Sequence, residues 1–293
     1  MLTQFFGNYL LQKDIITSQQ LMQALQHKNS TGSKLGSLAV NAGYMTEAEV
    51  EDVHNMQTRY DKRFAEIAIH MGYLTSQQAE ELLNTQKLGY VMLGNSIITL
   101  GFASETDIQE AVAAYESEFN LDHTNILYAG QDIVDEMVGK FYGFENKTEH
   151  NLPKAYATLL IKNIIRFIGN DCSLCSPVKE LPEIVAPFTS HQDITGEYNS
   201  NTYICGDISS FIAFANRYAG EAFEDDSDFI KESVSDFLNL HNGLFTVNVS
   251  NDYNIDLELT PPYTDEVTPN LKSGSYIIPI EFTFGIIYFI FTA

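Results

Sequence analysis

The chain has 293 residues, 44% of them hydrophobic and 12% aromatic, which predicts two globular domains with their own cores and excludes a disordered chain. The 16 basic and 39 acidic residues give a net charge of −23, which disfavours binding to nucleic acid or to an anionic membrane surface. The first residues lack the basic start, apolar run and cleavage site of a secretory signal, so we expect a cytoplasmic protein without membrane insertion.

A repeated pattern fills the first third of the sequence. A Phe or Leu followed by Gly or Ala recurs at positions 6, 35, 64 and 93, and a Thr or Ser recurs at positions 17, 46, 75 and 104. Each of these hydroxyl residues has Gln, Glu or Asp three positions later, the capping-box pattern that starts a helix. Gly43, Gly72 and Gly101, with Asp14 at the matching place in the first copy, predict the left-handed end of a preceding short helix. Each copy is therefore expected to be a short helix followed by a longer one.

Four such units are expected to stack into one all-α domain over residues 1–117, because a single unit cannot bury its apolar face alone. The two central copies, 34–57 and 63–86, are separated by five residues, 58–62. They resemble the tandem motif in the N-terminal domains of type II secretion and type IV pilus assembly ATPases of the MshE type, some of which bind cyclic di-GMP. No ATPase domain follows in this sequence.

The resemblance implies a cyclic di-GMP site on the two central copies. Its candidate residues are Lys34, Leu35, Gly36, Gly43, Gln57, Arg63, Phe64, Gly72 and Gln86. Lys34 stands where the motif has Arg, and Ala65 stands where it has Gly. Lysine lacks the planar fork that arginine presents to a phosphate or a guanine edge. The alternative is a helical module that binds a protein or only spaces domains.

The second domain is expected over residues 118–293. Helix patterns cover 125–144, 152–170 and 209–223, and strand patterns cover 171–179, 192–198, 201–207, 277–282 and 286–291. Strands that pair across short turns beside helices predict an α+β domain with a mainly antiparallel sheet. The apolar C-terminus is interrupted by Pro279, Glu281 and Gly285, so we expect buried strands there and not a membrane helix.

Cys172 and Cys175 have the C-x-x-C spacing of redox and zinc sites. No second pair is present, and no helix start follows the first cysteine to lower its pKa. Three cysteines are also too few for a disulfide scaffold. We therefore interpret both residues as ordinary reduced thiols.

An amphipathic helix is expected over residues 232–245. At about 100° per residue, one face carries Val234, Phe237, Leu238, Leu244 and Phe245. His241 lies on the same face, and we interpret it as a packed histidine without a catalytic role. Asp236 and Asn239 lie on the opposite, exposed face, where residues three apart are neighbours. A solvated helix surface is the simplest interpretation of this pair.

Asp236 and Asn239, followed by Gly243 and by Pro261, give this helix a resemblance to the CheX/CheC family of chemotaxis phosphatases. The helix of that family carries Asp/Ser-x-x-x-Glu-x-x-Asn, and a proline follows at the end of a later strand. The resemblance covers about residues 120–293. It implies a signalling protein that hydrolyses the aspartyl phosphate of a response-regulator receiver domain, with Asn239 holding the attacking water and Asp236 contacting the receiver.

The resemblance places the Mg²⁺ of this reaction on the receiver, so the chain is expected to have no cofactor and no metal ligands of its own. Asp236 is one methylene shorter than the family's Glu, about 1.5 Å, and a misplacement of about 1 Å can cost ~100-fold in rate. Glu232 also stands where the family has Asp or Ser. The alternative is a non-enzymatic adaptor that reads cyclic di-GMP or a protein through its repeats and forms a homodimer through the second domain.

Overall fold

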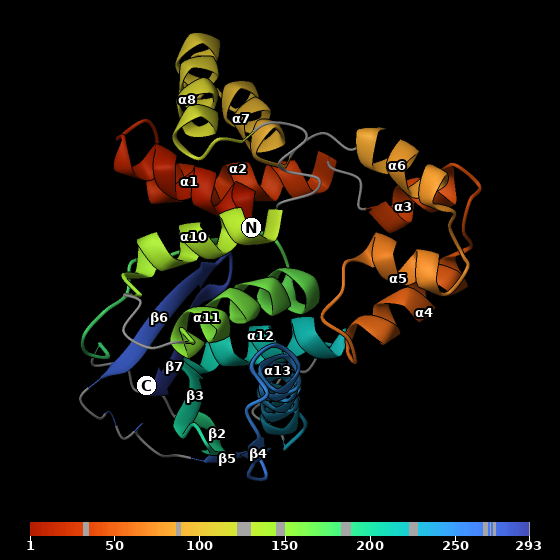
Figure 1. The fold of residues 1–293 in the computed structure, drawn as a ribbon. Helices are drawn as coiled ribbons and strands as arrows, with labels where there is room; N and C mark the ends of the chain where they lie inside the picture. The colour runs from red at the N-terminus through yellow and green to blue at the C-terminus, as the bar shows by residue number, and fades with distance from the viewer. Residues whose placement is uncertain are drawn as a thin grey trace.

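The computed structural model describes residues 1–31, 35–85, 89–121, 130–144, 150–182, 189–222, 228–265, 269, 271 and 274–292. It has the α+β class expected from the sequence, with an antiparallel sheet, helices packed on the sheet, and a helical N-terminal part (Figure 1).

The helices of the N-terminal part are α1 (Leu2–Gln12), α2 (Ser18–Thr31), α3 (Leu35–Asn41), α4 (Glu47–Gln57), α5 (Phe64–His70), α6 (Ser76–Thr85), α7 (Gly89–Thr99) and α8 (Glu105–Glu118). The helices that follow are α10 (Gly130–Tyr142), α11 (Leu152–Asn163), the π-helical turn η1 (Ile164–Ile168), α12 (Ile208–Ala219) and α13 (Asp228–Tyr253). The strands are β1 (Cys172–Leu174), β2 (Thr189–Gly196), β3 (Ser200–Gly206), β4 (Leu257–Leu259), β5 (Tyr263–Asp265), β6 (Ser275–Phe282) and β7 (Gly285–Thr292).

The predicted capping boxes are present at the starts of α2, α4, α6 and α8. In α4, the Glu49 amide donates to Thr46 Oγ1 at 3.3 Å, and the Thr46 amide donates back to Glu49 Oε2 at 2.7 Å. Ser104 and Asp107, which match the pattern less closely, form the same reciprocal pair at the start of α8. The chain turns of all four copies are left-handed, at Asp14 (φ 54°), Gly43 (φ 70°), Gly72 (φ 77°) and Gly101 (φ 71°).

A glycine in the short helix of the first, second and fourth copies lets that helix approach the longer one. A Cβ on Gly36 would come within 2.7 Å of Val50 Cγ1, and a Cβ on Gly94 within 2.8 Å of Ile108 Cγ2. The third copy has Ala65 at this place, and Ala79 stands in the register position that Val50 and Ile108 occupy. In the third copy, the larger residue on the short helix, Ala65, is thus accompanied by a smaller residue on the long helix, Ala79.

We expect Gly36→Ala to destabilise the protein by about 1–2 kcal/mol, because a β-branched valine in a helix has little freedom to move away and the overpacking outweighs the better helix propensity of alanine. In a Val50→Ala background the same change should be neutral or stabilising, since it recreates the pairing of the third copy. Urea unfolding of the four proteins measures the coupling. An equal cost in both backgrounds would show that the close approach does not matter.

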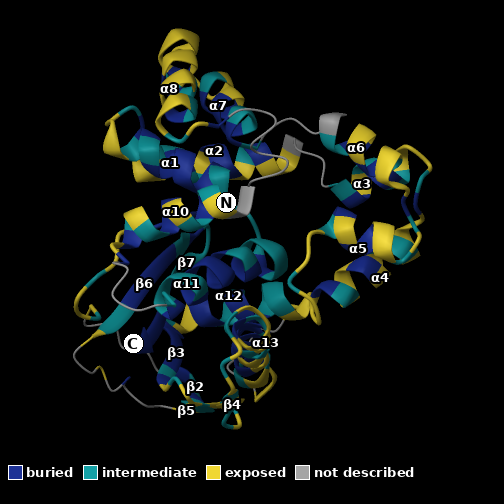
Figure 2. Cartoon of the chain, in the orientation of Figure 1, coloured by how far each residue is buried: buried dark blue, intermediate teal, exposed yellow. Residues whose placement is uncertain are grey.

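The four copies do not form the single stack that we expected. Helices α1, α2, α7 and α8 share one hydrophobic core with α10–α13 and the sheet, whereas α3–α6 form a separate small core, which we call the α3–α6 unit (Figures 1 and 2). The reason lies in the side chains. The outer short helices bury large residues such as Phe6, Leu10, Tyr90 and Leu93, while α3 buries only Gly36 and Ala39. The boundary at residue 117 stays a prediction.

Loop 58–62, between α4 and α5, holds the α3–α6 unit against the rest of the protein through the polar contacts of Asp61. Asp61 accepts from Arg166 Nη2 at 3.2 Å, from Lys162 Nζ at 3.4 Å and from Asn248 Nδ2 at 3.3 Å. The side chains of Asp61 and Arg166 are 12% and 13% exposed, so this ion pair is largely removed from water. Arg166 lies in the π-helical turn η1, and its side chain reaches loop 58–62 from there.

The sheet has the order β1-β6-β7-β3-β2-β4, with β5 also paired to β2, and each pairing is antiparallel. The C-terminal strands β6 and β7 form a hairpin in its interior, with Ser275 opposite Thr292. This confirms the expected strand pair. In the part of the chain that the structure describes, no helix is both long enough and apolar enough to cross a membrane.

Candidate functional site

Helix α13 carries the predicted acid and amide on its exposed face. Val234, Phe237 and His241 are at most 1% exposed, and the other apolar residues of the predicted stripe are buried beside them. Asp236 and Asn239 are both exposed. The periodicity of the sequence therefore placed both faces correctly, although the helix is longer than expected, with 26 residues from Asp228 to Tyr253.

Asp236 is held by a tyrosine of the neighbouring helix. The Tyr218 hydroxyl of α12 donates to Asp236 Oδ2 at 2.8 Å. Burial, and then this hydrogen bond, raise the pKa of Tyr218 above its ordinary value, so the hydroxyl remains a donor. The two residues line a shallow cavity of about 530 Å³ together with Ala219, Phe229, Glu232, Ser233, Ser235 and Pro262. Phe229 is 64% exposed, which gives this cavity an apolar rim.

Asn239 is held by a glutamine of the sheet. Gln192, in the middle of β2 and 0% exposed, donates from Nε2 to Asn239 Oδ1 at 2.8 Å. The same nitrogen donates to the Thr260 carbonyl at 2.8 Å, just before Pro261. Among the described residues, no partner is found for the Asn239 amide nitrogen. Asn239 therefore presents its N–H donors to solvent.

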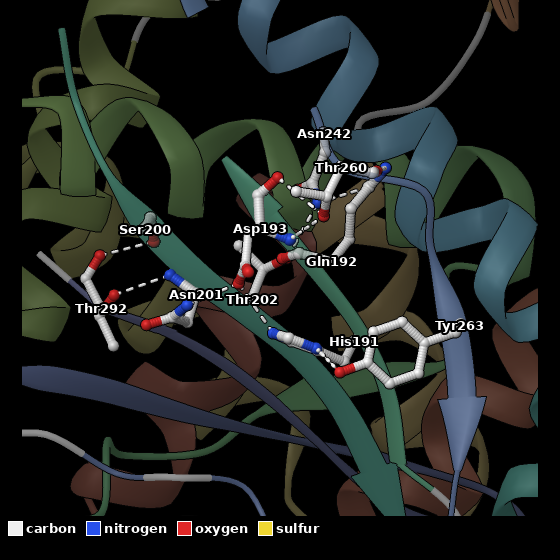
Figure 3. A network of polar contacts seen from close by, with 10 residues as sticks. All are labelled: His191, Gln192, Asp193, Ser200, Asn201, Thr202, Asn242, Thr260, Tyr263 and Thr292. Carbon is white, nitrogen blue, oxygen red and sulfur yellow. Dashed lines mark hydrogen bonds and ion pairs between the residues drawn. The ribbon is translucent and has the colours of Figure 1, made fainter. Parts of the chain in front are cut away.

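A buried network continues behind Gln192 (Figure 3). Asn242 Nδ2 donates to Gln192 Oε1 at 2.8 Å and to Thr202 Oγ1 at 2.9 Å, and Asn242 Oδ1 accepts from the Tyr156 hydroxyl at 2.9 Å. Asn242 is 0% exposed. A polar residue in this position of the helix is explained by these partners, which come from α11, β2 and β3. The sequence offered no signal for Gln192 or Asn242 as members of the site.

The opposite face of β2 carries a second polar group. His191 contacts the Tyr263 hydroxyl through Nδ1 at 2.7 Å and Asp193 Oδ1 through Nε2 at 2.8 Å (Figure 3). Its ring also stacks on that of Tyr203. Tyr263 belongs to β5, a strand that the sequence did not predict. Side chains alternate along a strand, so this group and Gln192 point to different sides of the sheet.

His241 is a packed core residue, as predicted. It is 1% exposed, lies edge-on to Tyr156 with ring centroids 4.4 Å apart, and has Asn163 Nδ2 within 3.1 Å of Nδ1. Burial lowers the pKa of His241 to about 3. The ring is therefore neutral, and it cannot act as a proton donor at neutral pH.

This depressed pKa makes the protein less stable in acid. Between pH 6.5 and about 3, the unfolded chain binds a proton at His241 that the folded protein excludes, so the free energy of unfolding falls as the pH falls. We expect His241→Gln, which can still accept from Asn163, to reduce this loss by up to about 1.4 kcal/mol per pH unit. Urea unfolding of both proteins at several pH values measures the difference. Parallel pH curves would contradict it.

The candidate cyclic di-GMP residues are spread over the α3–α6 unit. Lys34 and Gln86 lie outside the described residues. Gln57 is 5% exposed and donates to the Lys62 carbonyl at 3.0 Å, so its amide is used inside the unit. The remaining candidates differ in exposure. Gly36 is buried, Leu35 and Phe64 are half-buried, and Gly43, Arg63 and Gly72 are exposed.

The C-x-x-C pair lies at the edge of the sheet. Cys172 is buried in β1 and Cys175 is half-buried after it, and both are free thiols. Burial raises the pKa of Cys172 to about 12 and that of Cys175 to about 11, which is opposite to a redox-active thiol. Within the described ranges, no cluster of three or more His, Cys, Asp or Glu side chains is arranged to bind a metal ion.

Comparisons with known proteins give similarity in structure alone. No protein-family model and no curated protein matches the sequence. A chemotaxis protein CheX from Desulfovibrio desulfuricans is 15% identical with a TM-score of 0.41, over 48% of this chain and 98% of the other. A CheX from Vibrio vulnificus is 13% identical with a TM-score of 0.42, over 49% and 99%.

A chain of the CheX-CheY-BeF3-Mg²⁺ complex from Borrelia burgdorferi is 14% identical with a TM-score of 0.43, over 48% of this chain and 96% of the other.

Proposed function

We propose that this chain is a cytoplasmic signalling protein that hydrolyses the aspartyl phosphate of a response-regulator receiver domain, with Asn239 and Asp236 as the residues that meet the receiver. The observation that carries the proposal is the exposed pair on α13, in which Asn239 presents amide N–H groups and Asp236 presents a carboxylate on the same helix face.

Hydrolysis of an acyl phosphate needs a water molecule in line with the phosphorus–oxygen bond that breaks. An amide can hold such a water because its N–H groups donate and its oxygen accepts. The N–H groups of Asn239 have no partner among the described residues, and its oxygen has a second lone pair besides the one that Gln192 uses. Asn239 is thus suited to fix the water, while the receiver supplies the Mg²⁺ and the phosphoryl group.

The surroundings of Asp236 suit a protein partner that brings a cation to this surface. Glu232 and Asp236 are both exposed on the rim of the same cavity, and Phe229 and Pro262 add apolar surface beside them. An acidic patch with an apolar rim fits a lysine side chain flanked by apolar residues. Tyr218 holds the Asp236 carboxylate in one place, which limits the freedom of this shorter acid.

The proposal is tested by the lifetime of a phosphorylated receiver. Receiver domains from the organism of origin are phosphorylated with a small phosphodonor, the donor is removed, and phosphate release is followed with and without this protein. We expect faster release from at least one receiver, and a smaller gain with Asp236→Ala. Unchanged release from every receiver would contradict the enzyme.

A second proposal concerns the α3–α6 unit. We propose that this unit binds cyclic di-GMP or a protein partner. If the protein has no phosphatase activity, it acts as an adaptor that binds its partner through this unit and dimerises through its second domain. The unit has a hydrophobic core of its own, which favours a binding function distinct from that of helix α13. Calorimetric titration with cyclic di-GMP, for wild type and Arg63→Ala, tests the nucleotide. Heat that is lost in the variant supports it, and a flat titration of wild type overturns it.

A further inference from the structure

We propose that Gln192 is the positioning residue of the site: it holds the Asn239 amide in the one orientation that turns the N–H donors toward a docked receiver. This inference rests on the proposed function for its kinetic consequence. Its structural basis is a chain of hydrogen bonds in which each amide can be oriented in only one way.

The orientation is fixed from inside the protein. The Thr260 carbonyl can only accept, so the end of Gln192 that lies 2.8 Å from it is the NH₂ end. Gln192 Oε1 then faces Asn242, whose Nδ2 donates to it at 2.8 Å. Asn242 Oδ1 in turn accepts from the Tyr156 hydroxyl. Reversing any one of these amides would place two donors or two acceptors against each other.

Asn239 is the last residue in this series of hydrogen bonds, and it is the exposed residue among those just named. Because the nitrogen of Gln192 lies 2.8 Å from it, Asn239 has to offer its oxygen to the sheet, and its NH₂ group turns outward. An exposed asparagine without such a partner would rotate freely and present either end. Gln192, which is 0% exposed, therefore removes the rotational freedom of a surface side chain before the receiver arrives.

The informative variant is Gln192→Met, which keeps about the same length and volume of the side chain and removes the oxygen and the nitrogen of its amide group. The matched control is Ser190→Ala on the same strand. Ser190 is also 0% exposed and bonds Thr264 Oγ1 at 2.6 Å, and among the described residues it has no hydrogen bond to Asn239. Gln192→Met removes three hydrogen bonds and Ser190→Ala removes one, so the folded fraction of each variant is measured before their activities are compared.

In the receiver assay we expect Gln192→Met to lower kcat roughly tenfold with little change in KM, because the receiver still docks on α13 but meets a wrongly oriented amide. Ser190→Ala should keep the kcat of wild type when both are compared at equal folded fraction. Equal losses in the two variants, or a wild-type kcat in Gln192→Met, would overturn the positioning role.

A spectroscopic measurement separates this inference from the proposed function. The side-chain NH₂ signals of Asn239 in ¹⁵N-labelled full-length protein are assigned as those that vanish in Asn239→Ala. We expect a rigid NH₂ group in wild type and in Ser190→Ala, and a mobile one in Gln192→Met, seen as a loss of ¹⁵N order parameter on the ps–ns timescale. This result supports positioning even if no receiver is a substrate. Mobility that is equal in all three proteins overturns it, whatever the receiver assay shows.

Discussion

Asn239→Ala should lose the acceleration of receiver dephosphorylation almost completely, by about 100-fold or more. The variant removes the group that holds the attacking water and leaves the docking surface of α13 in place. It should therefore still bind the receiver. The measurement is phosphate release at saturating receiver, together with binding of the unphosphorylated receiver by calorimetry.

Asn239→Asp sharpens the same prediction. This variant keeps the size of the side chain and an oxygen for Gln192 to donate to, but it removes the N–H donors. We expect a loss as large as that of the alanine variant. Val247→Ala is the matched control, because Val247 is exposed on the same helix and lies outside the site. A fast Asn239→Asp protein would contradict the water-holding role, and a slow Val247→Ala protein would point to damage of the whole helix.

Phe237→Ala should destabilise the protein by about 3–5 kcal/mol. Phe237 is 0% exposed and contacts Phe214 edge-on with ring centroids 5.1 Å apart, so its removal leaves a cavity between α12, α13 and the sheet. Its ring centroid also lies 5.5 Å from that of Tyr218. The core therefore packs against the residue that donates a hydrogen bond to Asp236. The free energy of unfolding in urea measures the loss.

The control for this prediction is again Val247→Ala, which should change the free energy of unfolding by no more than about 0.5 kcal/mol, as expected for a surface substitution. A cost for Phe237→Ala near that of the control would mean that α13 is not anchored by its apolar stripe. In that case the rigid presentation of Asp236 and Asn239 could not be explained by packing.

Local patterns of the sequence predicted much of the fold. Capping boxes and left-handed turns depend on residues a few positions apart, so their positions were predicted, including the pair of Ser104 and Asp107. The two faces of α13 follow from helix periodicity alone. The α+β class follows from strands joined by short turns, and the C-terminal hairpin is where its apolar alternation indicates.

Features that depend on tertiary contacts could not be predicted from those patterns. Gln192 and Asn239 are 47 positions apart, and nothing in either segment indicates that they meet. The separation of the α3–α6 unit depends on which copies have residues large enough to pack against the sheet domain. Strand β5 has three residues, Tyr263 to Asp265, too few for a recognisable alternation, and its pairing with β2 is set by the fold around it.

The lifetime of the aspartyl phosphate on a cognate receiver shows directly whether this protein is a phosphatase that uses Asn239. In the presence of the wild-type protein, this lifetime should shorten in proportion to the protein added, and with Asn239→Asp it should return to that of the receiver alone. A lifetime that wild type leaves unchanged for every receiver tested would rule out the phosphatase activity, and a lifetime that Asn239→Asp shortens as much as wild type would rule out the role of Asn239.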